Sequence, residues 1–353
     1  MTKVIVGMSG GVDSAVAAYL LKKAGYEVIG MTLRTDNREG RCCEIDDARE
    51  IARQLHIRYY APNVITEFCE RVKQPFFNAY LHGRTPNPCV ECNRYVKWDR
   101  LMHFMSVLEA DYVATGHYAS VIRLENGRYT VQQAAFAEKD QTYMLCKLTQ
   151  NQLAHTLMPL GKYSKPQIRA IAEQAGMSVA QKQDSQEICF VTEGNYADLI
   201  EKDSASEIPG EGNFVTEDGE VIGKHKGIIH YTVGQRRGLG IAAGFPVYVC
   251  RIDPKRNEVV LGDERSLYCS EIRCHELNFM SIPDMEIGEK IQARVRIRYH
   301  HPGVWASVEQ ETCDTVRIVF EDPVRAATPG QSAVFYDEAD RVIGCGIISG
   351  SQQ

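Results

Sequence analysis

The residues that most constrain the fold lie at the start of the chain. Val4-Ile5-Val6 is a short β-branched apolar run, which predicts a buried strand. A glycine turn follows at Ser9-Gly10-Gly11, and apolar residues at helical spacing then run from Ser14 to Ala24 before the stop at Gly25. A strand, a glycine turn and a helix N-terminus together form an anion site, because N–H groups and the helix dipole converge where no side chain blocks a phosphate.

This turn differs from the common phosphate-binding motifs. No Gly-Lys-Ser/Thr closes it, and it does not follow the GxGxxG pattern. Asp13 would lie beside the phosphates of such a ligand. Its carboxylate would repel them unless a cation lies between the two, so Asp13 predicts Mg²⁺. A turn that needs glycine for its geometry alone is the alternative. If the turn binds a nucleotide, its phosphates are expected to contact Gly7, Met8, Ser9, Gly10, Gly11, Val12, Asp13 and Ser14.

Strand and helix patterns alternate through the first half of the chain, which predicts an α/β fold with a doubly wound parallel sheet. Nucleotides bind such sheets at the carboxyl ends of the strands. We therefore expect Leu33 to pack near the adenine and Gly116 to let backbone approach the nucleotide. The predicted strands are 27–33, 57–60 and 111–118, and the predicted helices are 46–55 and 163–176, the latter capped by Ser164.

Two cysteines lie in a proline-rich segment, Gly83–Asn93. Prolines on both sides of Asn87 predict a stiff, non-helical loop. Cys89-x-x-Cys92 suits a metal, an iron–sulfur cluster or a dithiol couple. No matching CxxC or HxxxH follows, which argues against structural zinc. A further cysteine, Cys189, follows a polar turn.

Chain length and composition restrict the class of protein. A chain of 353 residues predicts two or three domains. No apolar run reaches the ~18–20 residues that span a membrane, and no signal-peptide pattern is visible, so we expect a cytoplasmic protein without membrane association. Twelve cysteines then indicate reduced thiols, metal ligands or redox catalysts. The expected domains are a catalytic domain over 1–200, a small mostly-β adaptor over 201–268 and a β-barrel over 269–353.

A basic stretch interrupts a chain with a net charge of −6. Gly223–Arg256 holds seven Lys/Arg against one acid, Asp253. Its first part, His225–Gly240, is also aromatic and glycine-rich, as expected where a backbone lies along phosphates. A solvated basic hairpin is the alternative. Turn residues and short alternating runs predict hairpins here.

The last part, roughly Cys269–Gly350, reads as short strands and predicts a small β-barrel. Within it Ile291–Arg298 alternates strictly. One face is apolar, and the other, with Arg294, Arg296 and Arg298, is predicted to meet a polyanion.

Seven motifs taken together resemble the tRNA-specific 2-thiouridylase family, in the PP-loop ATP pyrophosphatase superfamily. They are SGGVDS, TPNPCVECN, ATGHYA, KDQTYML, DSQEICF, HKGIIHYTVGQRRGLG and RYHHPG. They occur in the family's order over almost the whole chain. The resemblance implies that the 2-oxygen of the wobble uridine, position 34, attacks the α-phosphate of ATP. Sulfur then replaces AMP to give 2-thiouridine.

The resemblance also implies roles for residues. Cys189 would carry sulfur from a cysteine desulfurase or relay protein, and Cys92 would be the second catalytic thiol, forming a transient disulfide with it. Asn87, Pro88 and Cys89 would contact the target base. Further expected tRNA contacts are Lys139, Asp140, Gln141, Arg298 and Tyr299, in a charged turn and a strand end. The implied partners are tRNAs for Lys, Glu and Gln, and we expect a monomer.

Cys89 departs from the family, many members of which have Asp at this position. A thiol of pKa ~8.5 cannot replace a carboxylate acid/base unchanged. Cys89, Cys92 and Cys189 could instead hold a 4Fe–4S cluster whose fourth iron stays open to bind sulfide. The sequence favours this cluster over a pure persulfide relay. Both schemes need Cys92 and Cys189, and they differ on Cys89.

Two other functions remain open from the residues alone. One is a PP-loop ligase or amidotransferase, which shares the loop but needs no paired thiols. The other is a nucleotide-sensing RNA-binding protein without catalysis, which would release no pyrophosphate.

Overall fold

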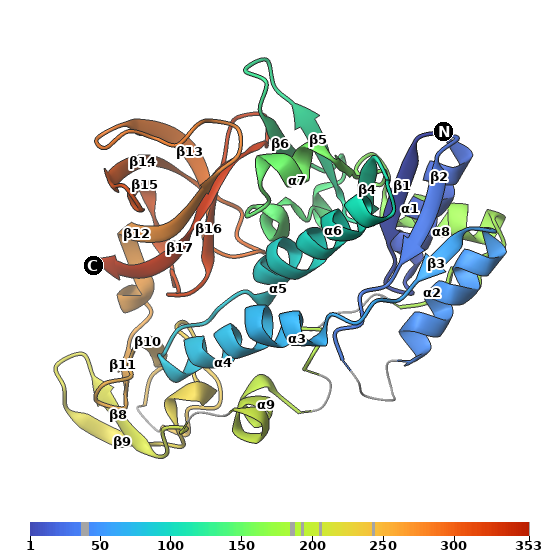
Figure 1. The fold of residues 1–353 in the computed structure, drawn as a ribbon. Helices are drawn as coiled ribbons and strands as arrows, with labels where there is room; N and C mark the ends of the chain where they lie inside the picture. Colours follow the sequence, from blue (N-terminus) through green and yellow to red (C-terminus); the bar gives the residue numbers. More distant parts are fainter. Residues whose placement is uncertain (37–41, 184–187, 192–193, 205–206, 242–243, 353) are drawn as a thin grey trace.

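The computed structural model describes residues 1–36, 42–183, 188–191, 194–204, 207–241 and 244–352. Figure 1 shows an N-terminal α/β part, a small β part and a C-terminal barrel in chain order. This is the predicted fold class. Among the described residues no helix is both long and apolar enough to cross a membrane.

The α/β part is built on a parallel sheet with the order β3-β2-β1-β4-β7. Val4, Ile5 and Val6 are fully buried in its central strand, as their apolar side chains require. The strand order reverses between β1 and β4, which is where doubly wound sheets bind ligands. The strands are β1 Lys3–Gly7, β2 Glu27–Met31, β3 Arg58–Tyr60, β4 Tyr112–Thr115 and β7 Thr156–Leu157.

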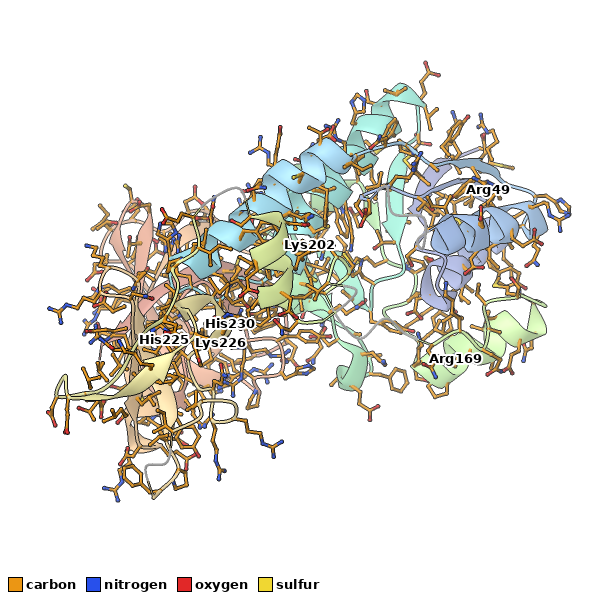
Figure 2. All side chains as sticks on the ribbon, turned by 90° about the horizontal axis from the view of Figure 1, so that it is seen from below. Arg49, Arg169, Lys202, His225, Lys226 and His230 are labelled. Carbon is orange, nitrogen blue, oxygen red and sulfur yellow. The ribbon has the colours of Figure 1, made fainter. Side chains whose placement is uncertain are left out.

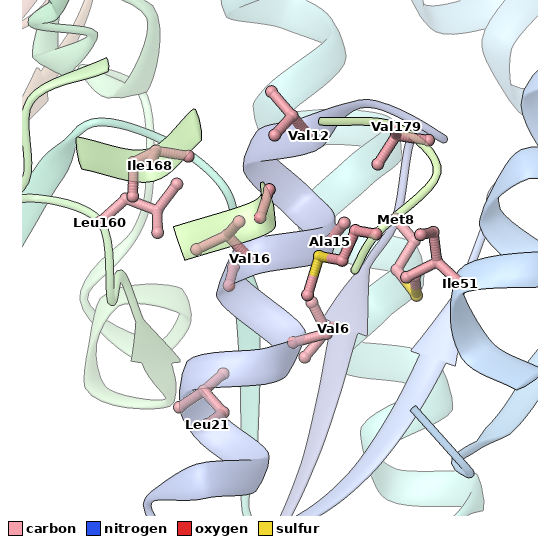
Figure 3. Close-up of a cluster of buried hydrophobic side chains, with 14 of the residues drawn as sticks. Val6, Met8, Val12, Ala15, Val16, Leu21, Ile51, Leu160, Ile168 and Val179 are labelled. Atoms are coloured by element: carbon pink, nitrogen blue, oxygen red, sulfur yellow. The ribbon is translucent and has the colours of Figure 1, made fainter. Parts of the chain in front are cut away.

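Helices cover both faces of this sheet. Val4 and Val6 pack with α1, α2 and α8 on one face (Figure 3), whereas Ile5 packs on the other with Leu101 of α6. The predicted cap of α8 is confirmed, since Ser164 and Gln167 form a capping box. The bounds are α1 Val12–Lys23, α2 Cys42–Gln54, α6 Asp99–Val107 and α8 Lys165–Gln174.

A helical block between β3 and β4 was missed by the sequence patterns. In particular, the prediction of a non-helical loop through Asn93 is wrong beyond Asn87. Pro88 takes the first position of helix α5, where its missing N–H costs nothing, and the Asn87 side chain caps the helix. The block contains α3 Ile65–Phe68, π-helix η2 Cys69–Lys73, α4 Gln74–Leu81, α5 Pro88–Cys92 and π-helix η3 Asn93–Trp98.

The rest of the α/β part connects β4 to the middle of the chain. After β4, strands β5 and β6 form a separate hairpin that extends towards the barrel (Figure 1). The elements are β5 Ala119–Arg123, β6 Tyr129–Gln133, 3₁₀ turns η4 Ala137–Lys139 and η5 Thr142–Leu145, α7 Gln150–Ala154 and α9 Tyr196–Asp203.

The small β part is a four-stranded sheet with the order β10-β11-β8-β9. The predicted hairpin over 213–222 is present, and Gly219 in its turn has a φ of +86°, which glycine adopts without strain. The elements are β8 Gly212–Thr216, β9 Val221–His225, 3₁₀ turn η6 Ile228–His230, β10 Tyr248–Asp253, β11 Glu258–Gly262 and 3₁₀ turn η7 Arg265–Leu267.

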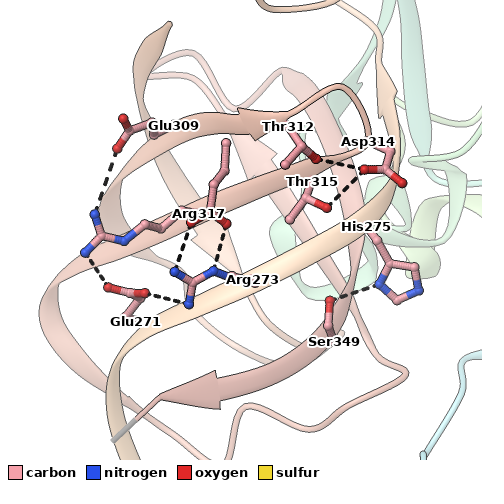
Figure 4. A network of polar contacts seen from close by, with 10 residues as sticks. Glu271, Arg273, His275, Glu309, Thr312, Asp314, Thr315, Arg317 and Ser349 are labelled. Carbon is pink, nitrogen blue, oxygen red and sulfur yellow. Dashed lines mark hydrogen bonds and ion pairs between the residues drawn. The ribbon is translucent and has the colours of Figure 1, made fainter. Parts of the chain in front are cut away.

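The C-terminal strands close into a six-stranded barrel, as predicted. Ion pairs cross its outer face (Figure 4), where Arg273 contacts Glu311 at 2.7 Å and Glu271 at 3.0 Å. The strands are β12 Tyr268–Phe279, β13 Lys290–Arg296, β14 Val304–Thr312, β15 Thr315–Arg325, β16 Ser332–Tyr336 and β17 Val342–Gln352.

The arginine face of β13 has a different role from the predicted wall for a polyanion. Arg294 pairs with Asp340, and Arg296 pairs with the buried Asp140 at 3.3 Å. Arg296 also lies over the ring of Tyr336, 4.7 Å from its centroid. Arg294 and Arg296 therefore each pair with a carboxylate of the protein, Arg294 near the surface and Arg296 in the interior, and Arg298 alone of the three is exposed.

The barrel and the parallel sheet share one hydrophobic core. Val334, Tyr336 and Val342 of the barrel belong to the same buried cluster as Ile5 and Ile29 of the sheet. Polar contacts reinforce the junction: the Thr130 hydroxyl donates to the Val342 carbonyl at 2.5 Å, and Arg128 donates to the carbonyls of Phe279 and Met280 at 2.9 and 2.8 Å.

The Arg296–Asp140 pair is expected to matter for stability. Replacing Arg296 with Met leaves a carboxylate that is 5% exposed without its cation, which we expect to cost about 3 kcal/mol in urea unfolding at pH 7. The control Arg294→Met breaks a pair with 26% and 40% exposed side chains and should cost less than about 1 kcal/mol.

The same pair predicts a pH dependence. Burial raises the pKa of Asp140, and bonds from Thr142 and the charge of Arg296 oppose that rise. Without Arg296 the folded-state pKa rises further, so folding of the variant is penalised at neutral pH and relieved as the carboxylate protonates. The gap in unfolding free energy between the wild type and Arg296→Met should narrow as pH falls towards about 4. A gap that is constant from pH 7 to 4.5 would contradict this account.

Candidate active site

The glycine turn lies at the carboxyl end of β1, directly before α1. Gly10 has a φ of +70°, and Gly11 is the N-cap of α1, so the helix begins at Val12, two residues earlier than predicted. The Ser14 hydroxyl accepts from the Ser9 N–H and donates to the Gly11 carbonyl, both at 3.1 Å. These bonds fix the turn while the helix N-terminus faces outward as an anion site.

Lysines surround the turn. Both carboxylate oxygens of Asp13 accept from the Lys165 ammonium at 2.8 Å, and the Tyr118 hydroxyl donates to one of them at 2.7 Å. Lys182 donates to the Gly10 carbonyl at 3.1 Å. The cation that contacts Asp13 in this structure is therefore the Lys165 ammonium group.

The two residues expected near the nucleoside lie at strand ends. A Cβ on Gly116 would be 2.7 Å from the Ser14 nitrogen and 2.8 Å from the Asp13 carbonyl carbon. The close approach at Gly116 is therefore made to the first turn of α1, directly after the glycine turn. Leu33, just beyond β2, is partly buried between the sheet core and the helical block.

Cys89 and Cys92 lie on α5, which Asn87 caps by accepting from the Cys89 N–H at 3.2 Å. Cys92 is 8% exposed, Cys89 is partly buried and Cys189 is exposed. Burial raises the pKa of Cys89, and raises that of Cys92 to about 12; the charge of Cys189 adds to both rises. The structure thus brings the three predicted thiols into one electrostatic neighbourhood.

The thiols do not form a metal-binding arrangement as they stand. Across the part of the chain that the structure describes, no three His, Cys, Asp or Glu side chains converge as ligands. The polar turn Asp184-Ser185-Gln186 before Cys189 lies outside the described residues.

Lys97 is a site residue that the sequence patterns missed. It lies on η3, one turn after Cys92, and its charge lowers the pKa of Cys89 and Cys92 against the effect of burial. It also acts on His117, whose pKa burial lowers to about 3. His117 follows Gly116, so the charge of Lys97 affects both the thiols and the end of β4, which packs on the first turn of α1. A lysine five residues after a CxxC carries no sequence signal of its own.

The expected tRNA contacts divide into two groups. Asp140 is buried, and its carboxylate accepts from Thr142 and Arg296 inside the protein. Gln141 accepts from the Tyr118 N–H at 2.9 Å, and the Tyr299 hydroxyl donates to the Asp140 carbonyl at 2.9 Å. These side chains fix the junction between the sheet and the barrel.

The remaining polar contact candidates lie nearer the surface. Arg298 is exposed and donates to the Arg325 carbonyl at 3.3 Å, and Lys139 is partly exposed.

Two of the expected contacts to the target base lie against the protein interior. Pro88 is buried, and Asn87 donates to the Met144 sulfur at 3.5 Å.

The basic stretch presents its charges outward. His225 is buried between the Asn257 carbonyl and the Gly227 N–H, and His230 pairs with Glu201 at 3.1 Å, so both histidines have structural partners. Figure 2 shows Lys226 beside these two histidines. All seven cations of the stretch are exposed: Lys224, Lys226, Arg236, Arg237, Arg251, Lys255 and Arg256. This surface suits a polyanion.

The thiol geometry predicts an order of reactivity. At pH 8 iodoacetamide should alkylate Cys189 more than about tenfold faster than Cys92, because the reagent needs an accessible thiolate. Peptide mass mapping over time measures both rates. Exposed Cys313 is the control and should react at a rate similar to that of Cys189. Equal labelling of Cys92 and Cys189 in the folded protein would contradict the arrangement.

Comparison with known proteins covers the whole chain. Residues 2–193 match the family description "tRNA methyl transferase HUP domain", 198–263 match "tRNA methyl transferase PRC-barrel domain" and 269–348 match "Aminomethyltransferase beta-barrel domain". The tRNA-specific 2-thiouridylase MnmA of Lachnoclostridium phytofermentans is 48% identical over 99% of this chain and 99% of its own length. That of Acetivibrio thermocellus is 49% identical over 98% and 99%.

Among solved structures, the U34-tRNA thiolase NcsA from Methanococcus maripaludis with its [4Fe-4S] cluster is 19% identical, with a TM-score of 0.36. The match covers 57% of this chain and 63% of that one. At that TM-score the likeness carries no weight for the site.

Proposed function

Because the chain belongs to the tRNA-specific 2-thiouridylase family, we propose that it replaces the 2-oxygen of the wobble uridine of tRNA, position 34, with sulfur. The proposed enzyme is an ATP-dependent tRNA-uridine 2-sulfurtransferase that releases AMP and pyrophosphate. The observation that carries the proposal is that Cys92 and Phe190, the residue after Cys189, belong to one buried cluster. Lys97, on the same helical run as Cys92, lowers the pKa of Cys89 and Cys92 against the effect of burial.

The first proposed step activates the uridine. The phosphates of ATP lie against the turn Gly7–Ser14, where the N-terminus of α1 supplies N–H donors and Lys165 and Lys182 supply positive charge. The uridine 2-oxygen attacks the α-phosphorus, and pyrophosphate leaves with the electron pair of the broken P–O bond. The uridine then carries AMP, a far better leaving group than its own oxygen.

Mg²⁺ remains a proposal for this step. Asp13, the residue that suggested it, has both carboxylate oxygens on the Lys165 ammonium. A metal ion that binds Asp13 would have to displace the Lys165 ammonium. When bound, the ion would neutralise phosphate charge.

The second proposed step transfers sulfur. Exposed Cys189 is suited to accept sulfur from a donor protein, a cysteine desulfurase or a relay protein, as a persulfide. The terminal sulfur attacks C2 of the uridine, and AMP leaves with the electron pair of the C–O bond. The buried Cys92 then attacks the Cys189 sulfur, the transferred sulfur stays on the base, and a Cys92–Cys189 disulfide forms. A thiol reductant restores both cysteines.

A 4Fe–4S cluster on Cys89, Cys92 and Cys189 is the alternative for sulfur delivery. Three cysteines in one neighbourhood support it, but the described residues do not close into a ligand group. The persulfide route therefore describes this chain's residues better. When bound, a cluster would supply an open iron for sulfide.

The tRNA would lie across the basic stretch and the barrel rim. The seven exposed cations support contacts to phosphates, and Lys139 and Arg298 are the proposed contacts nearest the site. Asn87, Pro88 and Cys89 are proposed to contact the target base, while Asp140, Gln141 and Tyr299 would act by holding their neighbours. We expect a monomer acting on tRNAs for Lys, Glu and Gln.

Thiol replacement tests the function. With tRNA, ATP, Mg²⁺ and a persulfide donor, the wild type should form 2-thiouridine in tRNA nucleoside digests. Cys92→Ser and Cys189→Ser should fall to background, because serine neither carries nor resolves a persulfide. Cys313→Ser, which changes an exposed thiol on the barrel, is the control and should keep full activity. Full activity of either site variant would refute the sulfur-transfer mechanism, and pyrophosphate release that needs no tRNA would refute the activation step.

Metal analysis separates the two sulfur routes. We expect protein purified without oxygen to contain neither iron nor acid-labile sulfide. Cys89→Ala should lose only part of its thiolation activity, because in the persulfide route Cys89 contacts the base and carries no sulfur. Stoichiometric iron and sulfide that are lost in Cys89→Ala would favour the cluster instead.

A further inference from the structure

One short segment, 143–148, lies between the thiol helix and the barrel. On the side of the thiol helix, Asn93 donates to the Met144 carbonyl at 2.8 Å and Asn87 donates to the Met144 sulfur at 3.5 Å. The Lys147 ammonium contacts the Glu91 carboxylate at 2.6 Å. Residues before, within and after α5 therefore all hold the same six-residue segment.

The barrel holds the other side of this segment. Asn278 of β12 donates to the carbonyls of Cys146 and Leu148 at 2.8 and 3.2 Å. The Cys345 thiol of β17 donates to the Cys146 carbonyl at 3.2 Å, and the Tyr143 hydroxyl donates to the Ser332 carbonyl at 2.8 Å. The segment is thus attached to three barrel strands.

Lys147 joins the two sides through a single charge. Its side chain is only 2% exposed, and it contacts Glu91 of α5 and, at 3.0 Å, Glu276 of β12. Burial alone would lower the pKa of Lys147, yet the two carboxylates raise it above its ordinary value. The lysine is therefore charged at neutral pH, and an ammonium this deeply buried persists only with its partners in place.

The barrel strand is distorted where it supplies its carboxylate. Glu276 has a φ of +51°, and the register of β12 against β17 shifts between His275 and Asn278. A non-glycine residue in this conformation is strained and persists where the surrounding structure requires it. The bulge breaks the alternation of β12 at the residue that reaches Lys147.

We propose that Lys147 is a positioning residue for sulfur transfer, through which the C-terminal barrel sets the orientation of the helix that carries Cys89 and Cys92. The proposal rests on the proposed function in assigning sulfur chemistry to these thiols. Glu91 lies between the two cysteines in the first turn of the continuous helical run 88–107, so its contact with Lys147 holds the end of that run which carries both thiols. Lys147 acts through α5 and has no assigned contact with substrate.

Two substitutions test this proposal from opposite sides. Lys147→Met keeps the length of the side chain and removes the charge, and Glu276→Gln weakens the contact from the barrel alone. We expect kcat for 2-thiouridine formation to fall about tenfold or more in Lys147→Met, because small displacements of reacting groups are costly, and to fall less in Glu276→Gln. KM for tRNA and the first-turnover burst of pyrophosphate should stay unchanged, since neither residue touches the nucleotide turn.

The control is Arg273→Met, on the same strand as Glu276. It breaks ion pairs on the outer barrel face and should leave kcat unchanged. Glu276→Gln keeps the test decisive if Lys147→Met fails to fold, because the Glu276 side chain is 60% exposed. Unchanged kcat in folded Glu276→Gln, or a rise in KM for tRNA that matches the fall in kcat, would overturn the proposal.

A second readout does not depend on activity. Diamide takes two electrons and two protons from paired thiols, so the yield of the Cys92–Cys189 disulfide reports how often the thiols meet. We expect a yield at least about threefold lower in Lys147→Met than in Arg273→Met, by mass spectrometry of non-reduced peptides. Equal yields would overturn the proposal. If the wild type forms no 2-thiouridine, the proposed function fails, and this measurement still decides whether Lys147 orients the helix.

Discussion

The parallel arrangement of β1, β2 and β4 is the constraint on which the site depends. Parallel strands place all their carboxyl ends on one edge, so the glycine turn, Leu33 and Gly116 are brought together although they are far apart in the sequence. Gly116 is the tightest point of this edge, because its backbone packs directly on the first turn of α1. The thiol helix and its lysine are then added from the helical block between β3 and β4.

Charge compensation inside the protein is the second theme of the site. Three charged groups around the site each have a partner of opposite sign from another element: Asp13 has Lys165, Asp140 has Arg296, and Lys147 has two glutamates. The thiols are the exception, since burial opposes their ionisation and Lys97 only partly offsets it. Burial thus favours the neutral thiol of Cys92, and in the proposed mechanism the exposed Cys189 is the residue that accepts sulfur.

Local patterns predicted the parts of the fold that local forces determine. The buried run of β1, the capped helix α8 and the alternation of β13 were all predicted from residues next to one another in the chain. The start of α5 was missed because Pro88 resembles a helix breaker until its position after a capping asparagine is known. Asp140 was misjudged because its partner, Arg296, lies 156 residues away. Lys97 and Lys147 show their roles only once the helices and the barrel are in place.

The shared core of sheet and barrel bears on how the chain is made. Tyr336 and Val342 are synthesised long after Ile5, yet all three belong to one buried cluster. The α/β part therefore cannot complete its apolar interior until β16 and β17 have been made. A chain that stops before β16 would lack a complete barrel. Its α/β part would also keep an uncovered apolar face, which chaperones and proteases recognise.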